Sequence, residues 1–277
     1  DNRIKKIISV QECTNPLYLR AILDEVRVFG VHEQLESKIQ HYLNAQTIPE
    51  LFELILERYE QDYEINRPGL VHDIMTLLWA SRTGLSESDL ANILGDTFTP
   101  MPKGIMSPLL LATEQNLINR SGLLMFSHDF IRKAVEQRYL KNQSQKENIH
   151  MILAKFFFHY PLNERKILEL PWQIYNSDEK DQLKNVIETP EFLIKAVHLG
   201  KLSDLRLYWY HLKSKYDILQ TYLSKATIIC ESTKDKNTYL GYLSAVSIIF
   251  NYMGRYNDSE NFIGERLKFE INANTPI

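Results

Sequence analysis

The residues best placed to do chemistry are Phe126-Ser127-His128-Asp129, which follow two short apolar runs separated by Ser121-Gly122. The two runs predict a β-hairpin in which Gly122 supplies a positive φ. Because Ser127 is a typical N-cap, we expect a helix whose first residue is His128. An imidazole beside the free N–H groups of a helix start is suited to contact a phosphate oxygen. His128 is therefore a candidate phosphate contact, and the alternative is a histidine that only hydrogen-bonds across a domain junction.

A second candidate pair is Asn15-Pro16. Asn at an N-cap followed by Pro at the first helical position is typical of a helix start, and Gly30 is placed to end that helix. Helix initiation by itself explains both residues, so their types alone do not point to a ligand.

The elements that position these residues are almost all helices, because the apolar residues recur at the helical period. The spacing predicts a helical segment over 1–66, which ends before Arg67-Pro68-Gly69. Within 67–142 it predicts helices over 70–83, 87–94 and 103–115, a hairpin over 117–126 and a helix over 127–141. Three helices followed by a hairpin are the order of a winged helix.

Residues 143–277 predict paired helices without strands, which indicates an α-solenoid. The last pair contains Gly254-Arg255-Tyr256 and then Ser259, a turn followed by a small residue, as in a tetratricopeptide unit. Such a unit does not bury its own faces, so we expect further repeats beyond Ile277. The fold class predicted is all-α with a small β-wing: helical segment, winged helix, then tetratricopeptide-like solenoid.

Composition excludes several classes of function. The 277 residues carry a net charge of −3, which gives no general attraction for nucleic acid or anionic membranes. No apolar run is long enough to predict a transmembrane helix. Cys13 and Cys230 match no metal spacing, and we expect two buried thiols rather than a disulfide, with a cytoplasmic location. No nucleophile–base pair or metal cluster can be assembled from local spacing.

DNA binding is a minor alternative for the predicted winged helix. Its third helix, 103–115, contains one Lys and one Glu, and the hairpin tip offers only Arg120. Neutralising several phosphates requires more positive charge than this. We therefore expect no nucleic-acid partner and no membrane partner.

Four phrases, taken together and in this order, resemble one family. They are NPLYLRAILDEVRVFG at 15–30, LWASRTGLSE at 78–87, FSHD at 126–129 and ELPWQ at 169–173. The chain resembles the region that follows the nucleotide-binding domain in NACHT-type STAND NTPases with tetratricopeptide repeats, of the nephrocystin-three type. No phosphate-binding run Gly-x-x-x-x-Gly-Lys-Ser/Thr occurs in the 277 residues, so we expect no enzyme activity from this chain alone.

The resemblance implies a multidomain ATPase switch that binds ADP or ATP with Mg in the parent protein. By this resemblance, Pro16 lines the adenine pocket and His128 contacts the β-phosphate of ADP. The implied partners are an upstream nucleotide-binding domain, other proteins that bind the helical repeats, and a second copy of the chain. The alternative function is a non-catalytic interaction scaffold in a large assembly, with a cilium or the cytoskeleton as one setting.

Overall fold

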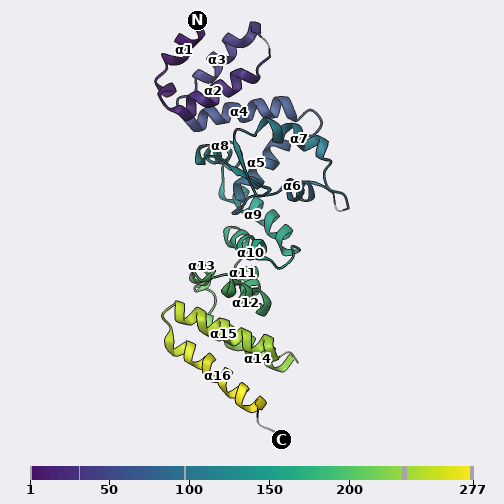
Figure 1. The fold of residues 1–277 in the computed structure, drawn as a ribbon, viewed down its shortest axis with the longest axis vertical. Helices are drawn as coiled ribbons and strands as arrows, with labels where there is room; N and C mark the ends of the chain where they lie inside the picture. Colours follow the sequence, from purple (N-terminus) through teal and green to yellow (C-terminus); the bar gives the residue numbers. More distant parts are fainter. Residues whose placement is uncertain (1, 31, 97, 233–235, 275–277) are drawn as a thin grey trace. The chain divides into compact units, whose positions relative to one another are not determined.

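The computed structural model describes residues 2–30, 32–96, 98–232 and 236–274 (Figure 1). The chain divides into two compact units, Asp1–Leu153 and Ala154–Ile277. Among the described residues, regular structure is helical apart from two short strands that form one antiparallel sheet. The prediction of an all-α chain with one small β element is therefore confirmed. The module boundaries near residues 66 and 142 stay predictions.

Unit 1 contains eight helices, two strands and most of a ninth helix within its described residues. The elements are α1 (Asn2–Ile8), α2 (Pro16–Val28), α3 (Leu35–Leu43), α4 (Ile48–Tyr63), α5 (Leu70–Ala80), α6 (Glu87–Leu94), α7 (Lys103–Ala112), β1 (Leu117–Arg120), β2 (Leu123–Phe126), α8 (Asp129–Tyr139) and α9 (Gln143–Phe158). Short 3-10 turns lie at Gln11–Thr14 and His32–Gln34. The helix α9 continues into unit 2.

Local capping explains where several of these helices begin. The Asn15 side chain accepts a hydrogen bond from the Leu17 N–H at 2.9 Å and so caps α2. Ser86 and Asp89 form a complete capping box at the start of α6. At α4, the Thr47 hydroxyl accepts from the Glu50 N–H, while the Glu50 carboxylate accepts from the Gln46 N–H rather than from that of Thr47.

The hairpin has the predicted position and a tight two-residue turn. Leu117 pairs with Phe126 and Arg120 with Leu123, so Ser121 and Gly122 form the loop with φ values of 53° and 86°. Two residues at positive φ give the turn type whose twist matches the strands. A further bridge joins Leu85 to Leu124, which ties the start of α6 to the hairpin.

The core of unit 1 is built around α5. Nine of the eleven residues of this helix are buried, so nearly all of its surface is covered by other elements. The neighbouring helix α4 packs against α5 and also against α2, α7 and α8. The helix α4 therefore connects the early helices with the hairpin region.

Unit 2 consists of helices in its described residues. They are the end of α9, α10 (Glu164–Asn176), α11 (Lys180–Ile187), α12 (Pro190–His198), α13 (Leu202–Leu212), α14 (Ile218–Ser232), α15 (Lys236–Tyr252) and α16 (Tyr256–Asn274). Thr189 precedes α12 but does not cap it, because its hydroxyl donates to the Val186 carbonyl.

Two further sequence predictions concern cysteine and membranes. Cys13 and Cys230 are both free thiols, and Cys13 is buried as predicted, but Cys230 is exposed on α14. Among the described helices, none has the length and apolar composition needed to cross a membrane.

Candidate functional site

His128 lies at the junction between β2 and α8. Its backbone is extended, with φ −146° and ψ 146°, and it occupies the N-cap position, so the helix starts at Asp129. The prediction that Ser127 caps this helix is wrong. The Ser127 hydroxyl and the Ser127 N–H both donate hydrogen bonds to the Asn116 carbonyl at 3.0 Å, and these bonds close the base of the hairpin. His128 is exposed, and its side chain makes no capping hydrogen bond.

Pro16 is the first residue of α2 and is exposed. Two residues further on, Tyr18 is fully buried, and its hydroxyl lies 2.7 Å from the Ala45 carbonyl and 3.2 Å from that of Tyr42. The start of α2 is thereby held against α3. In this structure the position of Pro16 is that of a helix starter.

His128 is the N-cap residue of α8, whereas Pro16 begins α2, so the two residues lie on different elements of unit 1. A direct polar link between α2 and the segment before the hairpin runs from Arg20 to Gln115, with 2.8 Å between the guanidinium and the amide oxygen. Gln115 and Asn116 also line a cavity of about 210 Å³ beside α2 and α4, and neither predicted residue lines it.

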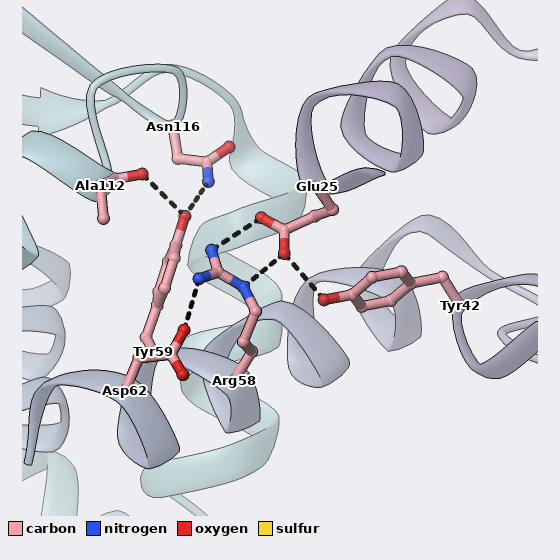
Figure 2. Close-up of polar contacts among 7 residues, drawn as sticks. All are labelled: Glu25, Tyr42, Arg58, Tyr59, Asp62, Ala112 and Asn116. Carbon is pink, nitrogen blue, oxygen red and sulfur yellow. Dashed lines mark hydrogen bonds and ion pairs between the residues drawn. The ribbon is translucent and has the colours of Figure 1, made fainter. Parts of the chain in front are cut away.

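The polar centre of this region is a cluster of four side chains from α2, α3 and α4, which we call the Glu25 cluster: Glu25, Tyr42, Arg58 and Asp62 (Figure 2). Arg58 donates to both oxygens of Glu25 at 2.5 and 3.0 Å and to Asp62 at 2.8 Å. The Tyr42 hydroxyl donates to Glu25 at 2.7 Å. Burial and the adjacent Glu25 carboxylate raise the pKa of Tyr42, which keeps it a neutral donor.

A second contact anchors the segment that leads into the hairpin. The Tyr59 hydroxyl accepts from the Asn116 amide at 2.9 Å and donates to the Ala112 carbonyl at 3.2 Å (Figure 2). Tyr59 is 1% exposed, and burial raises its pKa. Since Asn116 also accepts from Ser127, α4 fixes the base of the hairpin and, through it, the position of His128.

A third contact joins α4 to the end of α8. Arg138 donates to both oxygens of Glu60 at 2.8 and 2.5 Å, and Tyr139 donates to the same carboxylate. Burial alone would raise the pKa of Glu60, but the hydrogen bonds from Arg138 and Tyr139 lower it below its ordinary 4.5. Glu60 is thus a partly buried, paired carboxylate that joins α4 to α8.

In unit 2, the predicted turn at Gly254 joins two closely packed helices. Gly254 has φ 74° and ends α15, and the Ser259 hydroxyl on α16 donates to the Ser247 carbonyl at 3.0 Å. Ser259 is 1% exposed, and the rings of Phe250 and Phe262 stack at 5.6 Å. The small Ser259 lets the two backbones approach closely, which is the role that the sequence pattern predicts for it.

Unit 2 also has an open groove over α10, α11 and α12, which we call the α12 groove. It consists of a hollow of about 670 Å³ and a second of about 410 Å³, and both are lined by Leu162 and Glu191. The first hollow is mainly apolar, with Leu170, Ile174 and Phe192 among its lining residues. No motif in the sequence indicates this groove, because its lining comes from five different helices, α9, α10, α11, α12 and α15, and from the turns between them.

Metal binding finds no support in the described part of the chain, where no group of three or more His, Cys, Asp or Glu side chains is placed to hold an ion. The polar clusters of unit 1 are instead ion pairs and hydrogen bonds that connect helices.

Comparison with known proteins identifies helical-repeat relatives. The chain is 35% identical over 198 residues to a TPR repeat-containing protein of Dictyostelium discoideum, which covers 71% of this chain and 12% of that protein. It is 27% identical over 267 residues to tetratricopeptide repeat protein 41 of Rattus norvegicus, which covers 81% of this chain and 20% of that protein. A match to telomerase protein component 1 of Rattus norvegicus is 25% identical over 179 residues, or 56% of this chain and 7% of that protein.

These matches define the class of protein, which is an all-α solenoid with tetratricopeptide-repeat homologues. The chain spans 12% to 20% of the length of the first two relatives. No protein-family model matches it, and no solved structure is significantly similar to it.

Proposed function

We propose that this chain is a protein-interaction scaffold within a longer tetratricopeptide-repeat protein. The observation that carries the proposal is the close pairing of α15 and α16 through Ser259 and the Phe250–Phe262 stack. In helical-repeat proteins, stacked helix pairs form extended surfaces that bind other proteins. The names of the relatives support the same function.

The outer faces of the pair support this role. Ile248, Tyr252, Ile263 and Leu267 are large apolar side chains of α15 and α16 that are 41% to 52% exposed. Exposed apolar residues that recur along paired helices are suited to pack against a further repeat or a partner protein.

The test is binding to protein fragments displayed from a proteome library, with the whole chain as bait. We expect the chain to bind fragments with a Kd that ADP and ATP leave unchanged. Ile263→Asp on α16 should raise this Kd. Leu23→Asp is the control, because Leu23 on α2 is similarly exposed, at 48% against 41%. Absence of any specific protein ligand would contradict the scaffold function.

A second proposal is that unit 1 contains a winged helix that responds to nucleotide in the parent protein. The order α5, Leu85 bridge, α6, α7, hairpin, α8 supports a winged helix. The exposed His128 supports a phosphate contact, because no capping bond occupies its side chain. ADP or ATP with Mg, an upstream nucleotide-binding domain and a second copy of the chain remain partners under this proposal, and Pro16 remains the adenine contact.

The nucleotide proposal is tested on the longer protein rather than on this chain. His128→Ala should release ADP faster, while Asp129→Ala next to it controls for a change at the start of α8. Unchanged ADP dissociation in His128→Ala would remove the sensor role and leave the scaffold.

Weak retention on DNA at every salt concentration is expected, because α7 contributes only Lys103 as a cation. The location that fits both proposals is the cytoplasm.

A further inference from the structure

The α12 groove is an open hollow with large apolar residues at its rim. Phe158 is 59% exposed and Leu162 is 43% exposed, whereas Leu170 and Phe192, which line the same hollow, are buried. Large apolar side chains beside a hollow are typical of places where proteins bind peptides or other proteins. A molecule bound in the groove would therefore cover apolar surface that is otherwise exposed to water.

The groove continues along one face of α12. Glu191, Ile194, Lys195 and His198 line the second hollow, and their spacing of three, four and seven residues places them on one side of the helix. Seven residues of helix correspond to about 10 Å. The two hollows together therefore suit a segment of polypeptide rather than a single side chain.

The charges of the groove are unequal. Lys166 and Lys195 are cations and Glu191 is the one carboxylate among the residues that line the two hollows. The Lys166 ammonium donates to the carbonyls of Phe158 and Tyr160 at 2.6 and 2.9 Å, which holds it at the end of α9. Two of its three N–H donors are thereby used, and partial burial lowers its pKa. An acidic group placed near this ammonium would stabilise its charge.

We propose that the α12 groove binds a peptide segment of a partner protein that combines apolar side chains with at least one acidic residue. The apolar side chains cover Leu162 and Phe158, and the acidic residue lies near Lys166 or Lys195. The polar side chains of Gln182 and Asn185 on α11 can hydrogen-bond to the peptide backbone. This inference rests on the proposed scaffold function and names the chemistry of one partner.

The test uses a display library of random peptides selected on the whole chain, followed by synthesis of the enriched peptides and titration by fluorescence anisotropy. We expect enriched sequences to contain apolar residues together with Asp or Glu. Leu162→Gln should weaken binding at least about fivefold, since loss of a central apolar contact commonly has effects of this size. Leu207→Gln is the matched control, because Leu207 on α13 is 39% exposed and lies outside the groove.

A second pair of variants tests the charge. Lys195→Glu should weaken binding of the acidic peptides about tenfold at low salt and less at high salt. Lys213→Glu makes the same change of charge on an exposed residue outside the groove and should have a small effect. Circular dichroism melts of all four variants verify that each is folded.

The outcomes separate this inference from the scaffold function. If peptides bind but are unaffected by Leu162→Gln and Lys195→Glu, the groove assignment is overturned while protein binding stands. Enrichment of basic or purely apolar peptides overturns the acidic partner. Failure to enrich any peptide overturns the groove, and the fragment library then decides the scaffold function independently. Self-association that Leu162→Gln abolishes would identify a second copy as the occupant and overturn the partner peptide.

Discussion

Removal of the Arg58 guanidinium gives the sharpest test of how unit 1 is held together. In Arg58→Met, the Glu25 carboxylate loses both guanidinium hydrogen bonds and keeps only the one from Tyr42. The Glu25 side chain is 6% exposed and that of Arg58 is 12% exposed, so water cannot replace the lost partner fully. We expect α2 and α4 to separate more readily.

The size of the effect follows from burial. Breaking a buried ion pair by removing one partner costs about 3–5 kcal/mol, and the partial exposure of Arg58 favours the lower end, about 3 kcal/mol. For a unit of this size that corresponds to a fall in Tm of roughly 6–12 °C. Arg20→Met is the control, because Arg20 is 63% exposed and the variant loses only exposed contacts, the 3.6 Å ion pair with Asp24 and the hydrogen bond to Gln115. Exposed pairs of this kind contribute about 0–1 kcal/mol.

Hydrogen exchange measured by mass spectrometry can localise the change. Peptides from α2 and α4 should exchange faster in Arg58→Met, whereas peptides from α15 in unit 2 serve as the internal reference. The double variant Glu25→Leu/Arg58→Met removes both charges and should recover most of the lost stability.

Two results would refute this reasoning. One is equal exchange of α4 in Arg58→Met and Arg20→Met, which would mean that the buried pair contributes no more than the exposed one. The other is a double variant less stable than Arg58→Met, because a buried unpaired carboxylate would then not be the source of the loss.

Three further predictions follow from contacts in both units. Gly122→Ala should lower the free energy of unfolding by about 1 kcal/mol, because Gly122 has a positive φ. Gly84→Ala should lower it by at least about 1 kcal/mol more, because its Cβ would also lie 2.7 Å from a β2 carbonyl, whereas that of Gly122 meets open space. Thermal melts of the two variants compare these losses. The lowered pKa of Glu60 means that its contribution to stability is present above the ordinary 4.5 and is lost as the pH falls through the folded-state value. The difference in unfolding free energy between wild type and Glu60→Gln should therefore shrink on acidification, and a difference that grows would contradict the ion pair. Gly264→Ala on α16 should stabilise by about 0.5–1 kcal/mol, whereas Gly241→Ala on α15 should gain less, because its Cβ would lie 3.1 Å from an α12 side chain; equal gains in Tm would refute that close approach.

Helix starts, the hairpin and the tight turn before α16 were predictable because their signals are local. Asn15 and Gly254 act on backbone groups within a few residues, so their types and spacing determine the structure nearby. The same local pattern misplaced the start of α8 by one residue, because the Ser127 hydroxyl bonds to Asn116, eleven positions earlier, and not to the helix. Pro16 was assigned by resemblance, and His128 by its place at a helix start together with the resemblance. The nucleotide contacts of both residues stay predictions.

By itself, then, the sequence determined the helical class, the order of the elements and the close pairing of the last two helices. Only the tertiary structure decided which charges are paired. Glu25 meets Arg58 across 33 positions and Glu60 meets Arg138 across 78, whereas their spacing along the helices looks like that of solvated residues. Periodicity records which side of a helix is apolar, but an ion pair or a groove depends on which helix lies opposite. The α12 groove exists for the same reason, because packing brings four separate segments around one hollow.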